Sequence, residues 1–169
     1  MKVSKENISY LFYWIIIFVV AGSMIVYGLS KPIQFQGFDK SVNSNLSEGH
    51  QLMWTFYSYS LAYPIIIGFC EVLGGICLLF NRTRIFGCIL LTIILSNIII
   101  QDYIYDIIAL QSAIYYQVLI FIILIFDYDK VKRIFQELFK TNTRKKNLLL
   151  MLIAFVISIV LKLFETKII

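Results

Sequence analysis

Residues 68–84 read GFCEVLGGICLLFNRTR, an apolar stretch that contains one carboxylate, Glu71, and ends in a basic turn. Glu71 lies ten residues before Asn81. In a helix that rises about 1.5 Å per residue, this spacing places it near the middle of a bilayer. A charge at that depth costs roughly 2.5–3.5 kcal/mol, so we expect Glu71 to face other helices, with a partner or a proton. A functional acid and a neutral structural hydrogen-bonding group are equally good interpretations.

The chain around this stretch is apolar enough for a membrane protein. It has 169 residues, 60% of them hydrophobic, and a mean hydropathy of +0.83. Long apolar runs must form helices in lipid, because only then is every backbone polar group satisfied. We predict an all-α, polytopic transmembrane bundle with spans at 8–30, 61–80, 85–106, 109–126 and 147–164.

Basic residues alternate between the predicted loops. The N-terminal segment, the 81–84 turn and the segment 127–146 are rich in Lys and Arg, whereas the remaining loops balance or lack them. The net charge of +5 is therefore better explained by membrane topology than by nucleic-acid binding. The positive-inside rule predicts a cytoplasmic N-terminus and an external C-terminus.

The loops carry three further patterns. Residues 31–50 contain most of the turn-forming residues and the single histidine, His50, so we expect an irregular outer loop with a solvated His50. Residues 51–64 are rich in aromatic side chains, which favours a short interfacial helix over an aromatic ligand site. Residues 127–140 alternate apolar and basic positions with helical spacing, which is typical of a helix on the inner membrane surface, bound to anionic lipid.

Several polar residues inside the predicted spans are possible partners for Glu71. Lys31 closes the first span and has a long side chain that can reach either inward to Glu71 or outward to headgroups. Tyr27, Asn97 and Gln117 are the other candidate ligand-binding residues, and Glu71 is the candidate proton-handling group. Gly68, Glu71 and Gly75 share one helical face, and small residues on such a face favour close helix packing.

Metal and thiol chemistry have weak support. One histidine and three cysteines without a C-x-x-C spacing do not form a recognisable metal site. Cys77 and Cys88 lie at similar depth on either side of the 81–84 turn. Packing is the better interpretation, because a redox dithiol needs access and a lowered thiol pKa.

Residues 8–126 resemble the DoxX-like superfamily of small four-helix membrane proteins, which includes the MauE group. The resemblance rests on YGLSKPIQFQGF, with matches at Gly28, Lys31, Gly37 and Phe38, and on Glu71 followed by the Gly74–Gly75 pair, an aliphatic stretch and a basic turn. It implies a four-helix core over 1–126. A basic amphipathic segment, 127–146, and an additional C-terminal transmembrane helix, 147–169, would then follow.

The resemblance also implies a setting for the function. Members of the superfamily are linked to sulfur and quinone redox chemistry, to oxidative-stress complexes and to maturation of a periplasmic enzyme. We therefore expect a small subunit or accessory protein of a redox-linked process in the bacterial inner membrane. Its expected partners are membrane lipid and a membrane or periplasmic redox protein, without nucleic acid; the sequence assigns no cofactor, and a quinone is the candidate. A non-enzymatic scaffold for a protein or lipid is the alternative. A small transporter has less support, because a lone carboxylate makes a poor proton relay.

Overall fold

The computed structural model describes residues 4–39, 41–42, 45–140 and 147–165. These residues form helices and no strand, which confirms the predicted all-α class. The helices are α1 (Lys5–Phe35), α2 (Glu48–Tyr59), α3 (Ala62–Leu79), α4 (Arg84–Ile104), α5 (Leu110–Phe126), α6 (Tyr128–Leu138) and α7 (Leu148–Glu165). Contacts divide the chain into two units, Met1–Ile134 and Phe135–Ile169, and each is described by itself.

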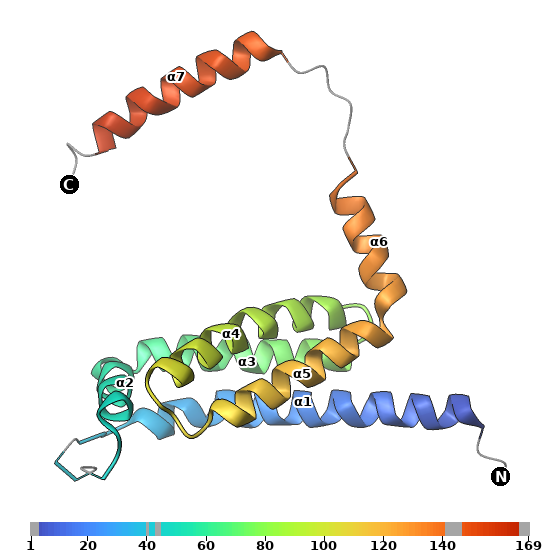
Figure 1. The fold of residues 1–169 in the computed structure, drawn as a ribbon, viewed down its shortest axis with the longest axis vertical. Coiled ribbons are helices and arrows are strands. Elements are labelled where there is room, and N and C mark those ends of the chain that lie inside the picture. The colour runs from blue at the N-terminus through green and yellow to red at the C-terminus, as the bar shows by residue number, and fades with distance from the viewer. Residues whose placement is uncertain (1–3, 40, 43–44, 141–146, 166–169) are drawn as a thin grey trace. The chain divides into compact units, whose positions relative to one another are not determined.

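The first unit is an antiparallel helical bundle. Figure 1 shows α1, α3, α4 and α5 side by side, with α2 across one end. α1 packs on α3 and α5, and α4 packs between α3 and α5. The bundle core is aliphatic, because each helix turns one stripe of large side chains inward. The fully buried members of this core include Ile17, Val20, Met24, Leu78, Leu91, Ile120 and Ile123.

Three helices among the described residues, α1, α3 and α4, are long and apolar enough to cross a membrane. α5 has 17 residues and meets α6 at a bend of 82°, and this bent pair is a fourth candidate. In α7 the apolar stretch Leu148–Phe164 is shorter than the other three. Many large apolar side chains on the bundle helices, such as Phe18, are exposed, as lipid-facing residues would be. The predicted spans are therefore helical, and the chain is a membrane protein.

The first helix continues beyond the point expected from the sequence. Residues 31–35 were predicted to begin an irregular loop, but α1 runs through Pro32 to Phe35. Pro32 removes only the bond to the Gly28 carbonyl, and the buried Phe35 ring packs 5.1 Å from Trp54 and 4.6 Å from Tyr57, between ring centroids. This aromatic packing stabilises the extra turn, and it keeps Lys31 on a rigid helix.

α2 confirms the short helix predicted before the second span. Its N-terminus is capped by the Ser47 side chain, which accepts a hydrogen bond from the His50 backbone N–H at 3.2 Å. His50 therefore lies in the first turn of a helix, half-buried, with its ring centroid 4.1 Å from that of Trp54. The expectation that His50 lies in an irregular loop is wrong, because the segment holds several possible helix caps and the chain uses Ser47.

Glycines allow α1 and α3 to approach closely. A Cβ added to Gly28 would overlap the Gly68 carbonyl oxygen, and one added to Gly68 would overlap the Gly28 carbonyl oxygen. A Cβ on Gly75 would lie 2.9 Å from the Ala21 carbonyl oxygen. The shared glycine face of α3 is thus a packing surface, as predicted. Lys31 and Glu71 each follow one of the crossing glycines by three residues.

A buried arginine links the opposite end of the bundle. Arg84 is 3% exposed and donates from Nε to the Leu78 carbonyl at 2.8 Å and from Nη1 to the Tyr13 hydroxyl at 2.8 Å. The Tyr13 hydroxyl in turn donates to Asp127 Oδ2 at 2.8 Å. In the sequence, Arg84 served only to predict the membrane topology. In the structure it connects α1, α4 and the end of α5 through hydrogen bonds.

α6 forms the amphipathic helix predicted from 127–140. Lys130 at its start donates to the backbone carbonyl of Asn81, and the apolar side chains of Ile134, Phe135 and Leu138 are exposed. Residues 141–146 of the predicted basic segment lie outside the described residues. α7 follows, and its first turn is capped by Asn147, whose Oδ1 accepts from the Leu150 backbone N–H at 3.4 Å.

Candidate functional site

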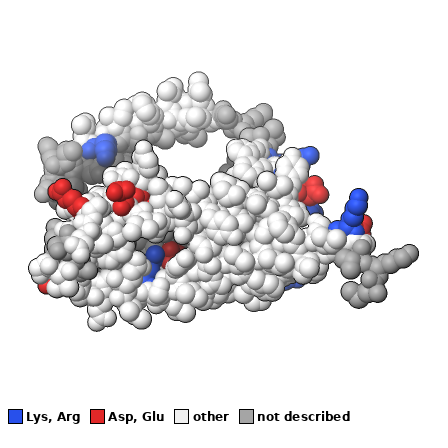
Figure 2. All heavy atoms as spheres, turned by 60° about the horizontal axis from the view of Figure 1, so that its bottom comes forward, with Lys and Arg blue, Asp and Glu red and all other residues white. Residues whose placement is uncertain are grey.

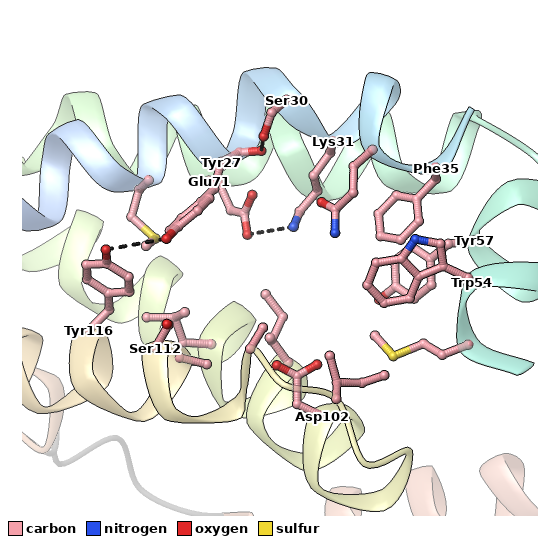
Figure 3. A pocket seen from close by; sticks show the side chains of 18 residues that line it. Tyr27, Ser30, Lys31, Phe35, Trp54, Tyr57, Glu71, Asp102, Ser112 and Tyr116 are labelled. Carbon is pink, nitrogen blue, oxygen red and sulfur yellow. Dashed lines mark hydrogen bonds and ion pairs between the residues drawn. The ribbon is translucent and has the colours of Figure 1, made fainter. Parts of the chain in front are cut away.

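The bundle contains a cavity of about 390 Å³ at the end covered by α2. This volume falls in the range of about 300–1,000 Å³ that is usual for small-molecule sites. Side chains from α1, α2, α3, α4 and α5 surround the cavity, and Figure 3 shows most of its polar and aromatic members. Those that the argument uses are Tyr27, Lys31, Phe35, Trp54, Tyr57, Glu71, Asp102, Ser112 and Tyr116.

Lys31 and Glu71 form an ion pair on one wall. Lys31 Nζ lies 3.1 Å from Glu71 Oε1, and the two side chains are 12% and 3% exposed. Figure 3 shows the Lys31 ammonium beside the Glu71 carboxylate, between α1 and α3. The Lys31 side chain therefore points inward to Glu71 and not outward to lipid headgroups. Glu71 Oε2 is buried and has no hydrogen-bond partner among the described residues.

Asp102 is a second carboxylate on the facing wall. It lies near the end of α4 and is 2% exposed. Its carboxylate points toward the space beside Lys31 and Glu71 (Figure 3). Asp102 Oδ2 has no partner within the described part of the chain. One lysine therefore faces two acids, and a buried carboxyl oxygen of each is free to accept a hydrogen bond.

Aromatic rings close the cavity at the α2 end. Phe35 stacks on Tyr57, and Trp54 meets Phe35 edge to face. The Tyr57 hydroxyl donates to Gln101 Oε1 at 2.6 Å, which ties α2 to α4 next to Asp102. Burial raises the pKa of Tyr57 above its ordinary value, so the phenol remains a donor.

Tyrosines from α1 and α5 mark the other end of the cavity. The hydroxyls of Tyr27 and Tyr116 are 3.5 Å apart, and their rings meet edge to face with centroids 5.8 Å apart. Ser112 lies one turn before Tyr116 on α5 and also lines the cavity. The cavity thus combines apolar and aromatic walls with a few convergent polar groups, an arrangement typical of a binding site.

The structure brings together three of the five candidate site residues. Lys31, Glu71 and Tyr27 line the cavity. Gln117 is buried elsewhere in the bundle, where its Nε2 donates to Thr92 Oγ1 at 3.3 Å. Asn97 is exposed on α4 and does not line the cavity. Depth along a span, which was the basis for choosing Asn97 and Gln117, does not determine which face of a helix a residue occupies.

Asp102 and the α2 aromatics are site residues that the sequence reasoning missed. Asp102 was not among the candidate residues, although it follows Leu91 by eleven positions and Leu95 by seven, and these two leucines mark the buried face of α4. That register was the available signal. Among the aromatic residues of 51–64, Trp54 and Tyr57 face the cavity, whereas Phe56 is exposed.

The three cysteines are free thiols. Cys77 and Cys88 are buried and Cys70 is half-buried; none lines the cavity. The described residues contain no cluster of three or more His, Cys, Asp or Glu side chains placed to hold a metal ion. The polar groups that line the cavity are those of Lys31, the two acids, the Gln34 amide, the Trp54 indole N–H and the hydroxyl groups.

The surface around the site fits a lipid environment. Figure 2 shows a face on which uncharged atoms predominate and basic and acidic atoms meet inside a hollow. Exposed apolar side chains on the bundle helices include Val26 on α1 and Phe69 on α3. The fold and the cavity together define a helical membrane protein with an internal polar site.

Comparison with known proteins places this membrane protein in a family. The chain is 32% identical over 120 residues to "Uncharacterized protein YwoB" of Bacillus subtilis (strain 168). The aligned part covers 70% of this chain and 78% of YwoB, so the chain belongs to the YwoB family. No family model matches the chain, and no solved structure matches it.

Proposed function

We propose that this protein is a DoxX-like small subunit or accessory protein of a redox-linked process at a bacterial inner membrane, and that its cavity binds a quinone-type lipophilic molecule. The observation that carries the proposal is the buried Lys31–Glu71 pair in the wall of an aromatic-lined cavity of about 390 Å³. A lipophilic ring would lie among the rings near Phe35 and Trp54. Its oxygens would form hydrogen bonds with the polar groups of the cavity, Lys31 among them.

Each side chain has a role that follows from its chemistry. The Lys31 ammonium has three N–H donors, of which one is directed at Glu71, so it can also donate to a ligand oxygen. Glu71 is close to that oxygen position and can exchange a proton with it. Reduction of a quinone to a quinol takes up two electrons and two protons; in this proposal a partner redox protein exchanges the electrons, and Glu71 relays the two protons in turn, regaining a proton from water each time.

The topology belongs to the same proposal. Basic residues at the N-terminus and in the α3–α4 turn would lie in the cytoplasm, which places α2 and the cavity near the outer side. The exposed apolar face of α6 would rest on the inner membrane surface, with its Lys and Arg side chains at anionic headgroups. α7 would be an additional span that ends outside.

Ligand-induced stabilisation tests the proposal. Purified protein in detergent is heated with and without a short-chain ubiquinone or menaquinone analogue, because a ligand that prefers the folded state raises the melting temperature. We expect stabilisation of the wild type that is reduced in Glu71→Gln. Glu137→Gln, which changes an exposed acid on α6, is the matched control and should respond like the wild type.

The scaffold alternative predicts a different result. If neither analogue changes the melting temperature of any variant, the quinone site is refuted. The Lys31–Glu71 pair would then act only between helices, and the exposed apolar face of α6 would be the feature to test against a partner protein or lipid.

A further inference from the structure

The two acids in the cavity are not both satisfied by the protein. Lys31 contacts Glu71 Oε1 at 3.1 Å. Glu71 Oε2 and Asp102 Oδ2 are both buried without a hydrogen-bond donor among the described residues, and the residues themselves are each 2% exposed. An unsatisfied buried acceptor is costly, and an ionised one more so. The facing walls of the cavity therefore present two acceptors that a ligand can satisfy.

The charges of Lys31, Glu71 and Asp102 also favour a ligand that donates hydrogen bonds. One ammonium faces two carboxyl groups, so one negative charge has no counter-charge when both acids are ionised. A ligand whose oxygens are only acceptors would bring further negative partial charge toward Asp102. A ligand with O–H donors would instead form a charge-assisted hydrogen bond, which is about twice as strong as a neutral one.

Lys31 does not distinguish these two kinds of ligand. A carbonyl oxygen and a hydroxyl oxygen can both accept from its ammonium. Only the hydroxyl can also donate to Glu71 Oε2 or Asp102 Oδ2. The two acids therefore decide between a carbonyl and a hydroxyl ligand. Asp102 has the larger part, because no described residue within salt-bridge distance neutralises its charge.

We infer that the cavity selects the reduced, dihydroxy form of its ring ligand over the dione, and that Asp102 is the specificity-determining residue. This inference rests on the proposed function and names the substrate form that the same site prefers. The aromatic walls bind either form, since stacking on Phe35 and Trp54 depends on the ring and not on its hydrogens.

A pair of matched ligands tests the inference. Dissociation constants are measured by calorimetry on the purified full chain in one detergent, for a decyl-substituted benzoquinone and for its hydroquinone kept reduced under anaerobic conditions. The wild type should bind the hydroquinone about tenfold or more tightly, which corresponds to the cost of one unsatisfied buried acceptor. Partition of the ligands into micelles is common to all variants, so the ratio of the two constants is compared between variants.

Two asparagine variants separate the site from general effects. Asp102→Asn preserves shape but supplies both a donor and an acceptor, so the preference for the hydroquinone should fall to about twofold or less. Asp106→Asn is the matched control. It removes an acid four residues away that is exposed, lies outside the cavity and has a φ of 53°, which asparagine also tolerates, so it should keep the wild-type ratio.

The outcomes distinguish this inference from the proposal on which it rests. Equal binding of the two forms, tighter binding of the dione, or an unchanged ratio in Asp102→Asn would overturn the inference and leave the quinone-type site in place. If neither form binds the wild type, the proposed function itself fails. A hydroquinone preference that is lost only in Asp102→Asn supports both.

Discussion

The contact between Gly28 and Gly68 provides a test of how this bundle positions its polar site. In Gly68→Ala the new Cβ overlaps the Gly28 carbonyl oxygen and lies 3.2 Å from the Gly28 carbonyl carbon. These are backbone atoms, so no side-chain rotation relieves the overlap. Carbon atoms normally pack about 3.5–4.0 Å apart, and α1 and α3 must therefore separate locally by roughly 1 Å.

This separation has a predictable cost. Overpacking costs typically 1–3 kcal/mol, and alanine returns up to about 1 kcal/mol through its higher helix propensity. We expect a net loss of about 1–2 kcal/mol. At roughly 2–4 °C per kcal/mol for a chain of about this size, the melting temperature should fall by about 2–8 °C. The same movement would stretch the Lys31–Glu71 contact from 3.1 Å beyond hydrogen-bonding distance.

The assay is thermal unfolding in detergent, followed by helical circular dichroism. Gly22→Ala is the matched control, because Gly22 also lies in a helix but a Cβ there meets no atom within 4 Å. It should melt at or slightly above the wild-type temperature. If Gly68→Ala melts with Gly22→Ala, the helices do not approach at these glycines and the close-packing argument is wrong.

Three further predictions concern other parts of the chain. Arg84→Ala removes a buried cation that donates hydrogen bonds to Tyr13 and to the Leu78 carbonyl, so the folded protein should lose about 3 kcal/mol of stability. Arg82→Ala changes an exposed residue and should alter stability by less than about 0.5 kcal/mol. Equal loss of stability in the two variants would contradict the buried network. Burial lowers the pKa of His50, so the unfolded chain gains a proton first and stability should fall as the pH drops below about 6.5. His50→Gln should flatten that part of a stability–pH curve, and an unchanged curve would exclude His50 as its source. The proposed topology is tested with single cysteines in a cysteine-free background. Val42→Cys, at an exposed loop position, should react with a membrane-impermeant maleimide in intact cells, and Arg82→Cys should not react. The reverse pattern would invert the proposed topology.

Hydrophobic patterning made most of the helices predictable, because long apolar runs have few other structures open to them in lipid. The boundaries that were missed lie where tertiary contacts act. α1 continues through Pro32 because Phe35 is buried against α2, and His50 is helical because Ser47 caps α2. The end of α1 depends on a packing partner that is distant in sequence. The start of α2 depends on which of several candidate residues caps the helix.

The sequence by itself determined that the chain forms apolar helices, that Glu71 needs a partner or a proton, and that the α3 glycines pack against another helix. These conclusions depend on local chemistry and on spacing along one helix. The tertiary structure alone decided that Lys31 turns inward, that Asp102 faces the same cavity, and that Asn97 and Gln117 do not. Such choices depend on the relative rotation and crossing of helices, which many distant contacts set together and which no single stretch of sequence specifies.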